Sequence, residues 1–218
     1  MGVDESRRQK KLMKRRQKHK LRRKNQAGSI HFELLSARKK ILFARKFPFY
    51  ECLINPSWKD QGLATILISR RQPDGDLVFG LFLVDIYCLG LKNTFCNADF
   101  SLSRYKTELL PKIYLEGKPV QCPIPLAHQI VYGGIAFAQQ FGFEPNKDFK
   151  LSQYVLDDKD SIELCEDVEF GKDGKPFFIA GPDDNVEHII RQLESRVGKG
   201  NFEYLVRLMP HEHLCSIG

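Results

Sequence analysis

"GLATILISRRQPDGDLVFGLFLVDIYCLG", residues 62–90, decides the fold of this 218-residue chain. Two runs rich in β-branched and other apolar residues, 63–70 and 77–88, flank the sequence Pro73-Asp74-Gly75. Proline presets φ for a turn, aspartate can bond its own backbone and glycine accepts a positive φ, so the stretch predicts a β-hairpin. The second run is almost wholly apolar, which predicts a central strand that is covered on both faces.

Helical patterns lie on both sides of this hairpin. Residues 29–47, "SIHFELLSARKKILFARKF", have apolar residues at helical spacing, which predicts a helix that begins near Ser29 and ends before Pro48. The same spacing in residues 125–143 predicts a helix, within which the pair Gly133-Gly134 indicates a close packing contact. We expect another short helix in residues 148–156, and helix or loop in residues 91–111.

The C-terminal third repeats the order of strand, turn and helix. Residues 168–181 predict a second hairpin with Lys172-Asp173-Gly174 at its tip, residues 182–197 predict a helix, and residues 202–208 predict a closing strand. The whole order predicts an α+β fold, a mostly antiparallel sheet with packed helices. We expect it to occupy residues 27–218 as one domain, with a possible sub-division near 143–165.

Two stretches also carry a resemblance. "FLVDIYCLGLKN", residues 82–93, and "FGKDGKPFFIAGPDDN", residues 170–185, resemble an uncharacterised family of bacterial α/β proteins. The resemblance spans most of the chain after residue 26. It implies a single globular unit and no particular activity.

The charge of the chain is concentrated at its N-terminus. Residues 1–26 contain twelve of the 34 Lys and Arg residues and two of the 27 acidic residues, a net charge of +10, whereas the remaining residues carry −3. Neighbouring like charges repel and the few apolar side chains cannot form a core, so residues 1–26 predict a disordered basic arm. Such an arm is typical of proteins that bind nucleic acid, and its affinity would come from counterions released by the phosphates.

We therefore expect nucleic-acid binding, with RNA slightly preferred over DNA because no helix shows the pattern of a sequence-reading DNA motif. The basic face of the helix expected after the arm extends the candidate surface, unless it is simply a solvated face. The candidate contacts are Arg7, Arg8, Lys10, Lys11, Lys14, Arg15, Arg16, Lys18, Lys20, Arg22, Arg23, Lys24, Arg38, Lys39, Lys40, Arg45 and Lys46.

Other uses of the arm stay open. It can be a targeting signal on a protein-interaction module, which would place the protein in the nucleus or nucleolus of a eukaryote and otherwise in the cytoplasm. We expect no membrane partner, because no apolar run is long enough to span a bilayer and no signal peptide follows the basic start. The six cysteines are scattered without a CxxC pair, so we expect them to be reduced.

Enzymatic activity is left open by the sequence, and no cofactor is expected for a binding protein. The alternative is a nuclease or related phosphoryl-transfer enzyme that holds Mg²⁺ with Asp85 and a second acid such as Asp99. Asp183, Asp184 and Glu187 are further acids, although a helix N-terminus favours negative charge there in any case. Asp85 can instead lie at a strand end or pair with Lys92 or Arg70.

Three weaker patterns complete the candidates. His211, His213 and Cys215 could lie on one face of an extended segment and bind a metal. A thiol–imidazole pair could form from Cys88 or Cys96 with His128, although a core cysteine and a solvated histidine are the simpler interpretation. The acidic stretch near residues 157–169 could fold onto the basic arm and shield it; its acids are Asp157, Asp158, Asp160, Glu163, Glu166, Asp167 and Glu169.

Overall fold

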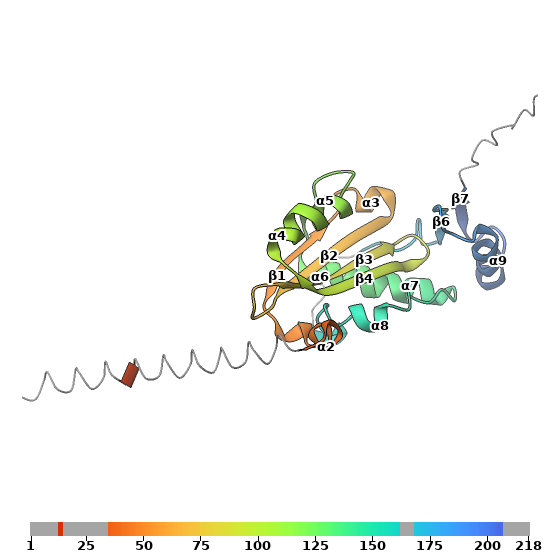
Figure 1. Cartoon of the computed structure of the whole chain (residues 1–218). Helices are drawn as coiled ribbons and strands as arrows, with labels where there is room; N and C mark the ends of the chain where they lie inside the picture. Colours follow the sequence, from red (N-terminus) through yellow and green to blue (C-terminus); the bar gives the residue numbers. More distant parts are fainter. Residues whose placement is uncertain (1–12, 15–34, 162–167, 207–218) are drawn as a thin grey trace, which may run out of the picture.

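The computed structural model describes residues 13–14, 35–161 and 168–206 (Figure 1). The remaining residues of the predicted arm and of the helix start near Ser29 lie outside these ranges. Within the described residues, no helix has both the length and the apolar character needed to cross a membrane.

A five-stranded sheet in the order β4-β3-β2-β1-β5 forms the centre of the molecule. Its strands are β1 (Phe49–Ile54), β2 (Leu63–Arg71), β3 (Leu77–Asp85), β4 (Gly90–Phe100) and β5 (Val120–Gln121). Every pairing in this sheet is antiparallel. The predicted hairpin is β2–β3, and its turn is held by the Asp74 carboxylate, which accepts a hydrogen bond from the Asp76 N–H at 3.0 Å. The α+β prediction with a mostly antiparallel sheet is confirmed.

Helices cover both faces of this sheet. On one face lie α2 (Ala37–Leu42), α8 (Phe149–Ser152) and a continuous helical segment made of α6 (Ile124–His128), η3 (Gln129–Gly133) and α7 (Gly134–Gln140). On the other lie α4 (Leu102–Arg104), η2 (Tyr105–Leu109) and α5 (Leu110–Ile113), as the labels above and below the sheet in Figure 1 show. Alternate residues of the central strands therefore enter two different cores, which explains the unbroken apolar run in β3.

Short elements connect these layers. η1 (Ala44–Lys46) joins α2 to β1, α3 (Trp58–Gln61) joins β1 to β2, and η4 (Lys159–Ser161) follows the loop after α8. The helix expected up to Pro48 thus continues only to Leu42 before it tightens into the 3₁₀ turn. Trp58 is buried in the core at the start of α3.

The prediction of helix or loop is wrong for residues 91–100, which form most of the edge strand β4 (Gly90–Phe100). The polar residues of "LKNTFCNADF" lower its intrinsic strand preference, but pairing with β3 outweighs it. Leu91, Thr94 and Ala98 are buried, while Asn93 and Asp99 are exposed. Buried and exposed side chains alternate only over short stretches, such as Asn93 to Phe95 and Ala98 to Asp99, because two irregularities in register interrupt the period of two.

The Gly133-Gly134 pair makes the close contact that its position predicts. A Cβ on Gly133 would lie 2.4 Å from the ring of Phe170, and one on Gly134 would lie 2.7 Å from Val84 on β3. Helix α7 consequently approaches the sheet more closely than a helix with larger residues could. Gly90, at the start of β4, lies in the same contact, because its own Cβ would be 2.6 Å from the Gly134 carbonyl oxygen.

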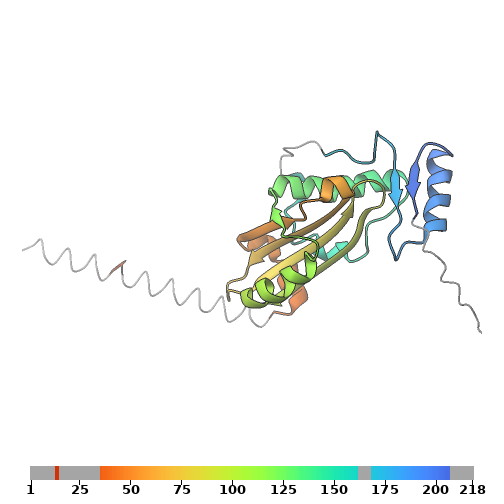
Figure 2. The ribbon, with the colours of Figure 1, turned by 90° about the horizontal axis from the view of Figure 1, so that it is seen from above.

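The second predicted hairpin is correct only at its tip. Asp173 and Gly174 have φ of +51° and +73°, as in a two-residue hairpin turn, and Lys172 pairs with Lys175 across it. The strand that follows, β6 (Phe177–Ile179), pairs instead in parallel with β7 (Glu203–Leu205), the closing strand. Between them, α9 (Val186–Val197) begins after Asn185, whose side chain accepts from the His188 N–H, and Figure 2 shows α9 alongside β6 and β7 at one end of the molecule.

We predict that Gly90→Ala destabilises the fold by at least about 2 kcal/mol more than Gly174→Ala. Both residues have a similar positive φ, +64° and +73°, so each substitution carries a backbone cost of about 1 kcal/mol. Only Gly90 adds a clash with the Gly134 carbonyl, since nothing lies within 4 Å of a Cβ at Gly174. Urea unfolding of the two variants measures the difference, and equal losses would contradict the close approach of α7 to the sheet.

Candidate nucleic-acid interface

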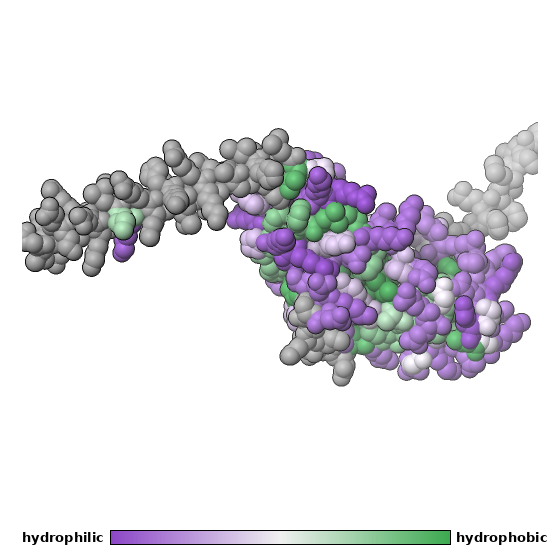
Figure 3. Space-filling model, turned by 90° about the horizontal axis from the view of Figure 1, so that it is seen from below, coloured by the Kyte–Doolittle hydropathy of each residue, from purple (hydrophilic) through white to green (hydrophobic). Residues whose placement is uncertain are grey.

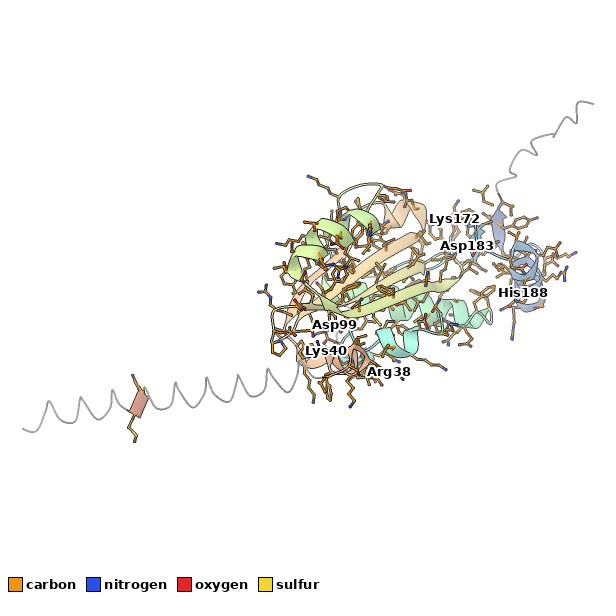
Figure 4. All side chains as sticks on the ribbon, viewed as in Figure 1. Arg38, Lys40, Asp99, Lys172, Asp183 and His188 are labelled. Carbon is orange, nitrogen blue, oxygen red and sulfur yellow. The ribbon has the colours of Figure 1, made fainter. Side chains whose placement is uncertain are left out.

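The five basic residues predicted on the helix after the arm divide into two groups. Arg38 and Lys39 on α2 and Lys46 on η1 are exposed and have no salt-bridge partner among the described residues. Lys40 is buried, with its Nζ 2.8 Å from Asp99 Oδ1 and 3.9 Å from Asp74 Oδ2. Figure 4 shows Lys40 beside Asp99, while Arg38 points away from the body.

Lys40 is therefore a structural residue, and its prediction as a nucleic-acid contact is corrected. Helical geometry gives the reason: Ala37, Lys40, Ile41 and Ala44 follow the i, i+3, i+4, i+7 spacing of an inward-facing stripe. Lys40 belongs to the stripe that packs on the sheet, and its ammonium group reaches the edge strand and the hairpin turn. This helical spacing was already visible in the sequence.

Arg45 is also committed to the fold. Its Nε donates to the Leu156 carbonyl at 2.8 Å, its Nη1 lies 2.8 Å from Asp158 Oδ1, and its guanidinium carbon stands 5.4 Å from the centre of the Tyr154 ring. These contacts join η1 to the loop after α8. Arg45 is thus less available to a phosphate than Arg38, Lys39 or Lys46.

Aromatic side chains accompany the exposed cations, a feature that charge counting alone does not find. Phe43 and Phe49 are 41% and 46% exposed, on either side of η1. The Lys46 Nζ lies 4.9 Å from the centre of the Phe43 ring, and the Arg71 guanidinium carbon lies 5.6 Å from that of Tyr50. We call Arg38, Lys39, Phe43, Lys46 and Phe49 the basic-aromatic surface; Arg71 is not part of it, because Arg71 pairs with Leu77 and so faces the opposite layer. The signal in the sequence is the run "FARKFPFY", in which aromatic and basic residues are interleaved.

The segment that carries this surface is tied to the sheet by Arg70. Arg70 is buried at the end of β2, and its guanidinium donates to the carbonyls of Phe47 and Val155 at 3.3 and 2.9 Å. Its Nη2 also lies 2.6 Å from Asp157 Oδ1. The next residue, Arg71, donates its N–H to the Pro48 carbonyl at 2.9 Å. Residues 47 and 48 are consequently fixed between α2 and β1.

His128 lies close to the Arg70–Asp157 pair and is neutral at pH 7. Its Nε2 accepts the Asp157 backbone N–H at 3.1 Å, and burial, reinforced by the neighbouring Arg70 and Arg45, lowers the pKa of its imidazole to about 4. Cys88 lies in the turn after β3 and Cys96 on β4, and among the described residues no hydrogen bond joins either thiol to His128, whose Nδ1 has no partner. The thiol–imidazole pair is therefore not formed.

Asp85 closes the turn between β3 and β4. Its Oδ1 accepts the backbone N–H groups of Tyr87 at 2.9 Å and Cys88 at 3.0 Å. Burial raises the pKa of its carboxyl group to about 6, against the lowering effect of those hydrogen bonds. The predicted ion pair of Asp85 with Lys92 or Arg70 is wrong, because Lys92 binds Asp184 at 2.6 Å and Arg70 binds Asp157.

The acids required for a nuclease site do not converge in the described structure. Asp85 and Asp99 lie at opposite ends of the β3–β4 ladder, about 25 Å apart at 3.3 Å per residue. Asp184 accepts from the Gly181 N–H at 2.8 Å and binds Lys92, while Glu187 pairs with Arg191 on α9. Figure 4 shows Asp99 and Asp183 at opposite ends of the molecule.

Metal-binding groups are likewise not assembled within residues 35–161 and 168–206, where no cluster of three or more His, Cys, Asp or Glu side chains is suited to hold an ion. The candidates His211, His213 and Cys215 lie outside the described residues.

The acidic stretch is partly built into the fold. Asp157 and Asp158 bind Arg70 and Arg45, while Asp160 and Glu169 are exposed. Glu163, Glu166 and Asp167 lie outside the described residues. Neutralising Asp157 and Asp158 would therefore disturb the fold, so a test of shielding must be confined to the other acids of the stretch.

Comparison with known protein families, with curated proteins and with solved structures gives no match to this chain. The resemblance to a bacterial family stays a prediction. The structure does bring its two stretches together: the Gly171 and Phe177 N–H groups donate to the carbonyls of Ile86 and Tyr87 at 2.9 and 3.0 Å. The Lys92–Asp184 ion pair joins them a second time.

We predict that Asp85→Asn is at least as stable as the unmodified protein at pH 8, whereas Asp85→Ala loses about 1–3 kcal/mol. Asparagine keeps an oxygen acceptor for the Tyr87 and Cys88 N–H groups and removes the cost of a buried charge, because the folded pKa of about 6 lies above the ordinary 3.8. Urea unfolding at pH 8 measures both variants. Equal losses would show that the negative charge itself is needed.

We predict that His128 lowers the stability of the fold as the pH falls from about 6.5 to 4. Its folded pKa of about 4 is below the ordinary value of 6.5, so the unfolded chain binds the extra proton and His128 contributes full stability only above pH 6.5. The loss approaches about 3 kcal/mol by pH 4. Asp85, whose folded pKa is raised, has the opposite slope between pH 3.8 and 6.

The measurement for His128 is therefore the difference in unfolding free energy between the unmodified protein and His128→Gln across this pH range. The difference isolates the imidazole, because Asp85 is common to both proteins. A difference that stays constant with pH would contradict a neutral, buried His128.

Proposed function

We propose that this protein binds nucleic acid, RNA in preference to DNA, through its N-terminal basic arm and the exposed cations that follow it. The observation that supports the proposal is continuity: the chain runs from a segment of +10 charge into α2 and η1, where Arg38, Lys39 and Lys46 are exposed and lack acidic partners among the described residues. Cations that are not neutralised by the protein are free to replace the counterions of a phosphate backbone.

The preference for RNA rests on what the described helices offer. Helix α9 exposes Glu187 paired with Arg191 at 2.9 Å, together with Glu194 near Lys199. A helix that reads the major groove presents unpaired donors to base edges, and acids on the same face would repel the phosphates. The proposal therefore assigns the body a role in positioning on a phosphate backbone, without sequence reading by a DNA-binding helix.

The nuclease alternative is not carried forward, because the carboxylates on which it depended are far apart and individually bonded. A protein partner for the folded body is the second candidate. It is favoured by exposed apolar side chains on the small β6–β7 sheet, where Tyr204 and Leu205 are 55% and 52% exposed.

The first test removes the arm. A shortened chain that begins at Ala27 is expected to lose most of its affinity for structured RNA, and the slope of log affinity against log salt should fall by several units, at roughly 0.7–0.9 for each phosphate that the arm no longer neutralises. Fluorescence anisotropy across a salt series measures both quantities. Unchanged affinity would overturn the role of the arm, and the absence of binding by the full chain would overturn the proposal and favour the protein-partner hypothesis.

The second test examines the body. Replacing Arg38, Lys39 and Lys46 by alanine in the full chain should lower the salt slope by about 2–3 units. The matched control replaces three exposed lysines from the opposite layer of the molecule, Lys106, Lys112 and Lys118, and so removes the same charge. Equal effects in the two triple variants would show that only net charge matters and that the α2–η1 surface has no special part.

A further inference from the structure

We propose that the basic-aromatic surface binds single-stranded nucleic acid, with unpaired bases stacked on Phe43 and Phe49. This inference rests on the proposed function and specifies the form of the ligand. Its basis is the exposure of two aromatic rings in a segment whose cations Arg38, Lys39 and Lys46 have no salt-bridge partner among the described residues. Backbone hydrogen bonds of Phe47 and Pro48 fix this segment to β2.

The Phe43 ring has a cation in place over one of its faces. Phe43 ends α2 and is 41% exposed, and Lys46, one turn later, holds its Nζ 4.9 Å from the ring centre. The Lys46 N–H donates to the Phe43 carbonyl at 2.9 Å, so the two residues keep this geometry through the backbone of η1. A base would thus stack on the other face of the ring, with the ammonium group of Lys46 close by for a phosphate of the same strand.

Phe49 lies on the same side of the sheet. It pairs with Arg70 in the β1–β2 ladder, and directly paired residues point to the same face. Arg70 points into the core under α2, where it binds Phe47 and Val155, so Phe49 faces that layer as well and is 46% exposed at its margin. Only η1 and two fixed residues separate Phe49 from Phe43 along the chain.

The outer face of this region fits a polyanion. Figure 3 shows apolar and hydrophilic surface interleaved at the end of the molecule that carries α2. The exposed hydrophilic side chains of α2 and η1 are Arg38, Lys39 and Lys46, and all three are basic, whereas the exposed acids nearby, Asp99 and Asp158, are paired with Lys40 and Arg45. A protein partner that covered the same rings would have to bring acids to these three cations, whereas a nucleic-acid strand brings a phosphate with each base.

Single strands fit this surface better than duplexes. The faces of bases in a duplex are covered by the neighbouring bases, so an exposed aromatic ring of the protein cannot stack on them. Unpaired bases stack on aromatic side chains irrespective of sequence. Stacking together with a cationic path along the backbone is the usual means by which proteins bind single strands without sequence preference. The surface supplies both in residues 38–49, which residues 27–37 separate from the arm.

The experiment compares four probes with the full chain: a single-stranded RNA of about 12 nucleotides, its duplex, a single-stranded DNA of the same sequence, and an abasic strand of equal length that keeps the phosphates. We expect the single strands to bind at least about fivefold more tightly than the abasic strand. Phe43→Ala and Phe49→Ala should each lower affinity for the single strands about tenfold. Their effect on the abasic strand should be less than twofold.

Two further variants keep the test specific. Phe43→Trp should preserve single-strand affinity, since a larger ring still stacks, whereas Phe43→Leu should behave like alanine although it stays apolar. Phe95→Ala is the control, because Phe95 is 53% exposed on β4 and pairs with Leu81 on the opposite face of the sheet. Thermal melts establish that each variant is folded before binding is compared.

The outcomes separate this inference from the proposed function. Equal binding of the abasic strand and the single strands, or equal losses for Phe43→Ala and Phe43→Trp, overturns base stacking while nucleic-acid binding stands. Failure of all four probes to bind overturns the proposed function itself. Equal affinity for RNA and DNA single strands supports stacking and removes only the preference for RNA.

Discussion

The hydrogen bonds of one buried group, the Arg70 guanidinium, are the interactions on which the rest of the structure depends. It stands at the end of β2 and bonds two carbonyls and a carboxylate from two distant parts of the chain, one at Phe47 and the other at Val155 and Asp157. A buried cation with no partners would cost several kcal/mol, so each of these groups is held in place by the need to satisfy it. The pair with Asp157 is weak evidence for net stability, but it fixes one arrangement of the loop after α8.

That arrangement decides which charges are available to a ligand. With the loop after α8 docked, Asp158 reaches Arg45 and the Asp157 N–H reaches His128, while Lys40 is turned inward to Asp99. The basic residues of α2 and η1 are thereby divided by position and not by type. The basic residues look alike along the sequence, but Lys40 and Arg45 bind groups of the protein itself, whereas Arg38, Lys39 and Lys46 are exposed.

The sequence predicted the elements whose signals are local. The β2–β3 hairpin has its turn chemistry and both apolar runs within 29 residues, and α9 has its capping residue next to its first turn. Strand β4 was missed because its polar residues and two register irregularities hide the alternation, and only pairing with β3 makes it a strand. The parallel pairing of β6 with β7 was missed because its partners are separated by a whole helix.

The same distinction holds for the candidate surface: the cations could be predicted from composition, and the burial of Lys40 was readable from its position in the helical stripe. The exposure of Phe43 and Phe49 could not be predicted, because exposed and buried aromatic residues look alike in a sequence, and Phe47 between them is buried. The three rings differ in exposure because Arg70 anchors their segment, and Arg70 lies more than twenty residues further along the sequence.

The meeting of residues 82–93 with residues 170–185 also constrains how the chain folds. The backbone carbonyls that receive the C-terminal third, those of Ile86 and Tyr87, belong to the turn that Asp85 closes after β3. That receiving edge exists only once the β2–β3–β4 meander has formed, and its contacts with residues 171 and 177 close loops of more than 80 residues. Folding should therefore proceed in an order that matches synthesis, with the meander as the early template and the α9 region as the last part to dock.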